Sequence, residues 1–120
     1  MRTKIQKAMS LVDKHYEFVY PLNVNTVLER VMSVARSVKG LYFSNFQQPG
    51  SVVLKSSASL WSWGETVTIE CRFFDPNHTL IHISSVPALA TTLIDWGKGQ
   101  KNIDRVLDAM RPVLPPTGRM

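Results

Sequence analysis

The chain has 120 residues, 44% of them hydrophobic, and a single cysteine, which suits one domain with its own core and excludes a disulfide framework or a multi-cysteine metal site. Its formal charge of +5 comes from Lys and Arg residues scattered among acidic ones, without a recognition motif, so the sequence favours a solvated surface over specific nucleic-acid binding. No apolar run approaches the ~18 residues of a membrane span, and we expect a cytoplasmic protein.

Residues 1–14 are predicted to be a lead-in or a short helix before a single domain at 15–111, and a proline-rich tail follows at 112–120. The basic start is also compatible with a targeting segment. Aromatic and β-branched residues predict the first strand at 16–20, which ends at Pro21.

A first helix is predicted next, because apolar residues recur at intervals of three and four between residues 24 and 38. Thr26 and Glu29 have the spacing of a capping box, so Asn25 or Thr26 is expected to cap the helix start. Gly40 is expected to end the helix, since glycine adopts the left-handed conformation that follows many helices.

Four more strands follow in the prediction. Those at 41–46 and 51–55 are separated by a polar turn. The clearest hairpin joins the strands at 65–74 and 78–85 around the turn at 75–77, where proline and asparagine suit the turn positions.

The register of this hairpin depends on its loop length. A three-residue loop sets Cys71 opposite Ile81 and makes one face apolar throughout, whereas a two-residue loop would set Cys71 opposite His82. We therefore predict the three-residue loop, with Phe74 opposite His78. The residues expected to face the helices are Val67, Ile69, Cys71, Phe73, Ile81 and Ile83. Those expected on the other face are Glu70, Arg72, Leu80 and His82.

A second helix is predicted from the helical spacing of apolar residues between 103 and 110, and Pro112 ends it. The pattern is compatible with an extension back to Leu93 and Trp96. Short connections between consecutive strands imply antiparallel pairing. The sequence therefore predicts an α+β fold, in which an antiparallel sheet of about five strands carries both helices on one face.

Two tryptophan–glycine segments, at 60–65 and 95–98, hold all three tryptophans of the chain. We expect Trp61 or Trp63 to meet Trp96 at one end of the sheet. The tryptophans either close the end of the core, which is their usual role in a small domain, or line a ligand pocket. The candidate ligand-binding residues are Trp61, Trp63, Glu65, Asp95, Trp96 and Lys98.

The basic residues around the start of the last helix form a second, weaker candidate, an anion site, because helix N-termini present free N–H groups. They are Lys98, Gly99, Lys101 and Arg105. The spacing of a P-loop is absent, and a solvated helix start is the alternative interpretation.

No catalytic motif, cofactor-binding motif or metal-ligand spacing occurs in the sequence, and we expect no cofactor. Glu70 and His82 could meet across the hairpin as an acid–base pair, or as an ordinary surface contact. Cys71 alternates in phase with the apolar residues of its strand, so we predict a buried, inert thiol.

The two tryptophan–glycine segments and the Asn102 that opens an Ile-x-x-Val-Leu helix resemble small bacterial proteins of unknown function in which such segments bracket a β-hairpin. The resemblance covers residues 16–110. The order of elements is also similar to a reduced helix-grip sheet, an architecture that binds apolar ligands in some larger families. The resemblance implies a fold and no particular reaction.

The sequence thus predicts a binding or interaction module for a small apolar or anionic ligand or a protein partner. The alternative is a small enzyme that uses polar groups near the tryptophan-lined end of the sheet or the face with Glu70 and His82.

Overall fold

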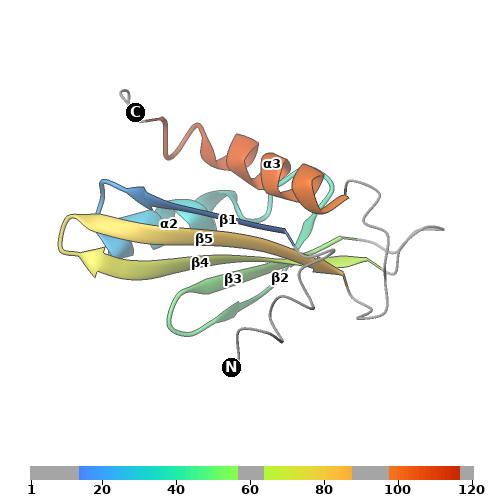
Figure 1. Ribbon diagram of the computed structural model, residues 1–120, viewed down its shortest axis with the longest axis horizontal. Helices are drawn as coiled ribbons and strands as arrows, with labels where there is room; N and C mark the ends of the chain where they lie inside the picture. The colour runs from blue at the N-terminus through green and yellow to red at the C-terminus, as the bar shows by residue number, and fades with distance from the viewer. Residues whose placement is uncertain (1–13, 57–63, 88–97, 117–120) are drawn as a thin grey trace.

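The computed structural model describes residues 14–56, 64–87 and 98–116. Five antiparallel strands form one sheet in the order β1-β5-β4-β3-β2, and two helices pack on one of its faces (Figure 1). The elements are β1 (Lys14–Tyr20), α2 (Val24–Val34), β2 (Tyr42–Gln47), β3 (Ser51–Lys55), β4 (Glu65–Asp75), β5 (His78–Pro87) and α3 (Lys98–Met110). This arrangement confirms the predicted α+β fold and its element order.

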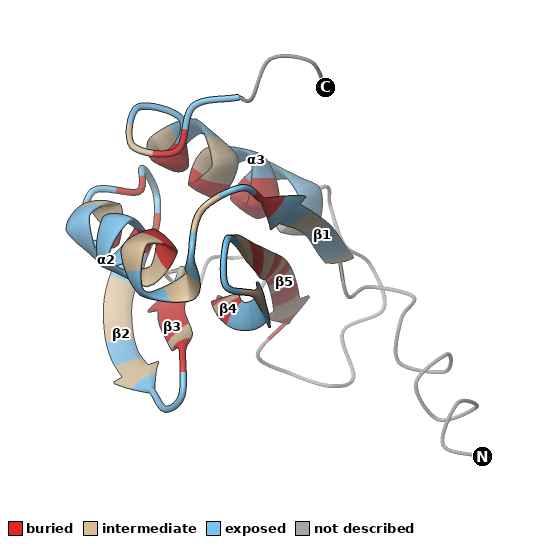
Figure 2. Cartoon of the chain, turned by 90° about the vertical axis from the view of Figure 1, so that its left-hand side faces the viewer, coloured by how far each residue is buried: buried red, intermediate tan, exposed pale blue. Residues whose placement is uncertain are grey.

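The core lies between the sheet and the helices, and Figure 2 shows the buried parts of both helices turned toward the central strands. Alternate residues of β4 and β5 face the helices, as period-two alternation requires. The large side chains with the least exposure come from every layer: Val27, Val31, Val52, Leu54, Val67, Ile69, Ile81, Ile83, Ile103 and Val106. Tight packing of these side chains fills the space between the helices and the sheet.

The register of the β4–β5 hairpin is the predicted one along most of its length. Cys71 pairs with Ile81 and Ile69 pairs with Ile83, so one face is apolar. Cys71 is 4% exposed, which confirms its predicted burial. Burial raises the pKa of its thiol to about 12, because the apolar surroundings disfavour the thiolate.

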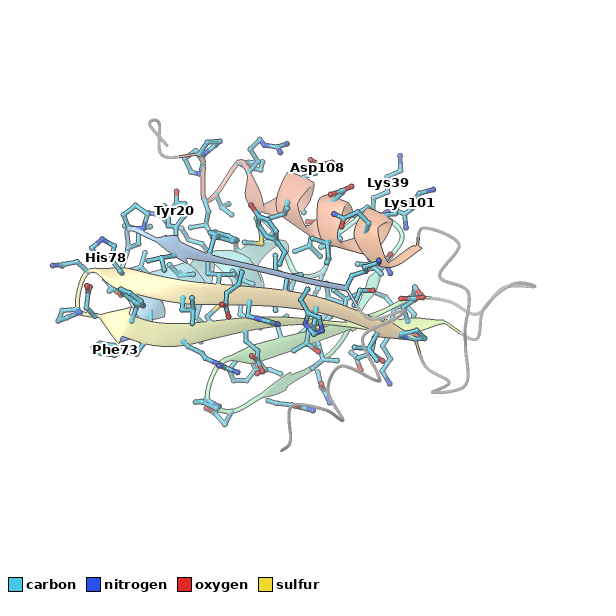
Figure 3. The ribbon with its side chains drawn as sticks, in the orientation of Figure 1. Tyr20, Lys39, Phe73, His78, Lys101 and Asp108 are labelled. Carbon is cyan, nitrogen blue, oxygen red and sulfur yellow. The ribbon has the colours of Figure 1, made fainter. Side chains whose placement is uncertain are left out.

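The turn of the hairpin differs from the prediction. Asp75 pairs with His78, and a bulge interrupts the ladder between Phe73 and Asp75. A two-residue turn plus one bulged strand residue has the same length as the predicted three-residue loop, which is why the rest of the register is unchanged. Phe73 keeps the predicted phase, since it pairs with the buried Thr79, but the helices do not cover it. Its side chain is 66% exposed, because the hairpin tip extends beyond the helices (Figure 3).

The ends of α2 also differ from the prediction. Asn23, not Asn25 or Thr26, caps the helix, and its Oδ1 accepts a hydrogen bond of 2.9 Å from the backbone N–H of Thr26. The helix ends at Val34, before Gly40. Gly40 nevertheless has the left-handed conformation expected of it, with a φ of 82°.

The chain continues to pack on the core after α3. Leu114 is buried, the hydroxyl of Tyr20 donates a hydrogen bond of 2.6 Å to the carbonyl of Pro115, and Nη1 of Arg30 donates to the carbonyl of Val113. These contacts fasten the segment after α3 to β1 and α2.

Neither helix in the described part of the chain is long and apolar enough to cross a bilayer.

Candidate functional site

Most of the ligand site predicted from the tryptophan segments lies outside the described residues. This holds for Trp61, Trp63, Asp95 and Trp96. The backbone of α3 begins at Lys98, but its side chain is not among those described. The predicted contact between the tryptophans therefore stays a prediction.

Glu65, the described carboxylate of that predicted site, belongs to a buried polar cluster. Its Oε1 accepts a hydrogen bond of 2.9 Å from the hydroxyl of Ser85, whose oxygen accepts one of 3.2 Å from Nδ2 of Asn102. All three side chains are buried. The cluster therefore links β4, β5 and α3, and each of these hydrogen bonds lowers the cost of burying polar atoms.

One of the predicted anion-binding residues, Arg105, meets the end of the α2–β2 connection. The guanidinium of Arg105 lies over Gly40. Lys101 is exposed and Arg105 half-buried. The side chain of Lys98 is not described, so an anion site here stays a prediction.

The face of the sheet away from the helices, called the open face, places Glu70 opposite His82 as predicted. However, Glu70 forms its ion pair with Arg72, and Nδ1 of His82 donates instead to Oε2 of Glu17 over 3.0 Å. Nε2 of His82 also lies 3.1 Å from Nδ1 of His15. The sequence could not identify Glu17 as the partner, because that requires knowing that β1 pairs with β5.

This Glu17–His82–His15 chain has a definite hydrogen-bond direction. A carboxylate only accepts, so Nδ1 of His82 carries its hydrogen and Nε2 of the neutral ring is an acceptor for Nδ1–H of His15. The arrangement could relay a proton.

No cluster of three or more His, Cys, Asp or Glu side chains able to hold a metal ion occurs in residues 14–56, 64–87 and 98–116.

An apolar concavity lies on the other side of β1, between this strand and the end of α3. Its volume is about 350 Å³. β1 contributes Tyr16, Phe18, Val19 and Tyr20. The end of α3 and the segment after it contribute Leu107, Met110, Arg111, Leu114 and Pro116. We call this concavity the β1–α3 groove.

Strand periodicity explains the aromatic wall of the β1–α3 groove. Tyr16, Phe18 and Tyr20 alternate along β1 and pair with Ile83, Ile81 and Thr79 of β5, which are buried under the helices. Since β1 is an edge strand, Phe18 is only partly buried and Tyr16 is 46% exposed, whereas Tyr20 is buried. Alternating aromatic residues were the available sequence signal. The groove was missed because α3 and residues 111–116 complete it.

No protein-family model and no curated protein sequence matches the chain. Several solved structures match it in shape. Norcoclaurine synthase from Thalictrum flavum, a point mutant in complex with a transition-state analogue, is 8% identical, and the match covers 85% of this chain and 92% of that one with a TM-score of 0.58. A START superfamily protein from Mycobacterium smegmatis is 8% identical over 85% of this chain and 96% of its own, with a TM-score of 0.50.

A conserved protein of unknown function from Enterococcus faecalis is 11% identical, and the match covers 98% of this chain and 85% of that one with a TM-score of 0.50. The fold is helix-grip-like. This confirms the similarity to a reduced helix-grip sheet predicted from the element order. Such low identities concern the fold alone.

Proposed function

We propose that the chain is a binding module that holds a small, mainly apolar ligand in the β1–α3 groove. The observation that carries the proposal is the composition of the groove, since three aromatic and several aliphatic side chains line a concavity of about 350 Å³. Small-molecule sites typically occupy ~300–1,000 Å³ and are lined in this way. The norcoclaurine synthase structure is a complex with a transition-state analogue, so this kind of fold accommodates a small molecule in that protein.

Binding is favoured over the enzyme alternative by what the groove contains. Among the described residues that line it, none is Asp, Glu, His, Cys or Lys. General acid–base catalysis usually depends on such side chains, or on Tyr, close to the substrate. Of the two tyrosines in the lining, Tyr20 already donates its hydroxyl hydrogen to the carbonyl of Pro115. The hydrogen-bonded His15 of β1 and His82 of β5 lie on the open face of the sheet and do not line the groove.

The expected affinity is modest. A ligand in this small, open groove gains only several kcal/mol from apolar burial, and lost translational and rotational freedom offsets much of that gain. Dissociation constants in the micromolar range or weaker are therefore expected.

Fluorescence titration with N-phenyl-1-naphthylamine, a neutral apolar probe, tests the proposal. The wild type should bind it, and Tyr16→Ser and Phe18→Ala should each weaken binding by about fivefold or more, because each removes ring surface from the groove. Phe74→Ala is the matched control, since this ring is 55% exposed at the hairpin tip and does not line the groove.

Circular dichroism should show that each variant is folded. Tyr16→Ser should destabilise the fold less than Phe18→Ala, because the ring it removes is already half exposed. Absence of binding to the wild type, or equal binding by the wild type and both folded groove variants, would refute the proposal.

A further inference from the structure

The charged group in the β1–α3 groove indicates which class of apolar ligand it takes. We infer that the ligand is an amphipathic monoanion, such as an aromatic or aliphatic carboxylate, whose negative group binds Arg111 at the rim of the groove. This inference rests on the proposed function. Among the described lining residues, Arg111 alone is charged at neutral pH, so an anionic group on the ligand would meet a cation without a competing carboxylate in the lining.

Arg111 is held in place by an interaction that a ligand can replace. Its Nη1 donates a hydrogen bond of 2.8 Å to Oδ1 of Asp108, one turn earlier on the helix. The two side chains are 59% and 67% exposed, and exposed ion pairs contribute only ~0–1 kcal/mol. A guanidinium has five N–H donors in a planar fork, and this pair uses Nη1, which leaves donors for a carboxylate of the ligand.

The helix end itself would ordinarily repel an anion, because the last carbonyl groups of a helix carry partial negative charge. Here two of these carbonyls are already bonded to backbone. The carbonyl of Leu107 accepts from the N–H of Arg111, and that of Met110 accepts from the N–H groups of Val113 and Leu114. Since both carbonyls have donors, the positive charge of Arg111 dominates this end of the groove.

These positions also orient the ligand. Phe18 and Leu107 are partly buried against the core and form the inner part of the groove, whereas Arg111 is mostly exposed at its rim. The apolar body of the ligand would lie against the inner side chains and its anionic group would stay near water. This arrangement avoids burying a charge, which would cost several kcal/mol.

Two probes with the same aromatic skeleton test the inference. 8-Anilinonaphthalene-1-sulfonate is anionic, and N-phenyl-1-naphthylamine is its counterpart without the sulfonate. Arg111→Gln should weaken binding of the anionic probe by about tenfold, as expected for loss of a charge-assisted hydrogen bond, and change binding of the neutral probe by less than about twofold. Asp108→Asn should strengthen binding of the anionic probe by about two- to threefold, because it removes the competing carboxylate.

Arg72→Gln is the matched control, because Arg72 is also 59% exposed and pairs with a carboxylate, but lies on the open face. It should bind both probes as the wild type does. High salt should weaken binding of the anionic probe by the wild type, and it should reduce the difference between the wild type and Arg111→Gln. Both results are expected for an electrostatic contact.

The outcomes separate the inference from the proposed function. If Arg111→Gln affects neither probe, or both equally, while Tyr16→Ser weakens both, the groove binds ligands but the anionic class is wrong. If the wild type binds neither probe, the proposed function fails and the inference fails with it.

Discussion

The guanidinium of Arg105 lies so close to Gly40 that a Cβ built on this glycine would be 2.5 Å from Nη1. Gly40 also has a φ of 82°. We predict that Gly40→Ala lowers the free energy of unfolding by about 1–2 kcal/mol, mainly through backbone strain, because the arginine end can move aside. Urea denaturation measures the loss.

Gly50 provides the comparison. A Cβ on Gly50 would lie 2.6 Å from the backbone carbonyl oxygen of Cys71, and a strand backbone cannot move aside as a side chain can. Gly50→Ala should therefore cost more than Gly40→Ala, about 2–3 kcal/mol. The opposite order would contradict this account of the two contacts.

The buried cluster of Glu65, Ser85 and Asn102 should be sensitive at its central member. Ser85→Ala removes both a donor to Glu65 and an acceptor from Asn102, so it should lower the free energy of unfolding by about 2–3 kcal/mol. Ser84→Ala, on the open face and half-buried, should change it by less than about 0.5 kcal/mol. Equal stabilities of the two variants would show that the cluster contributes nothing.

The Glu17–His82–His15 chain predicts the tautomers of two histidines. When the imidazole rings of His82 and His15 are neutral, both should carry their hydrogen on Nδ1. Nitrogen-15 NMR of the imidazole rings distinguishes this tautomer directly. Glu17→Gln should weaken this preference in His82. His78, which bonds Asp75 at the hairpin tip, should not change with that substitution. A neutral His82 ring with its hydrogen on Nε2 would contradict the structure.

The pKa of Cys71, raised to about 12, predicts a loss of stability in alkaline solution. The unfolded thiol loses its proton near pH 9, whereas the folded one retains it, so the contribution is complete below pH 9 and is lost as pH rises toward 12. The loss is at most about 1.4 kcal/mol per pH unit. Cys71→Val should reduce the slope of unfolding free energy against pH above 9. Identical slopes for variant and wild type would refute the prediction.

Local patterns predicted the fold because they are properties of neighbouring residues. The alternation around Cys71 determined the hairpin register, and helical spacing located both helices. The cap of α2 was misplaced because Asn23, Asn25 and Thr26 are all suitable cap residues, and only the path of the chain after β1 selects Asn23. Phe73 keeps its predicted phase yet is exposed, because alternation does not reveal where the covering helices stop.

The candidate site was less predictable than the fold, since it depends on pairings distant in sequence. Tyr16 and Arg111 are 95 positions apart, and nothing local connects them. Likewise, Glu17 becomes the partner of His82 only because β1 lies beside β5. The tryptophan segments were predicted as a site from their composition. The groove consists of common residue types that only the packing of α3 beside β1 brings together.

The single strand β1 separates two different surfaces, with aromatic rings toward the groove and the ionisable His15 and Glu17 toward the open face. Its seven pairs with β5 run without a bulge. Inserting or deleting one residue within β1 would exchange these two sets of side chains. A change of one residue in length should thus be tolerated less well here than any point substitution, because it would eliminate the ligand surface and the histidine chain together.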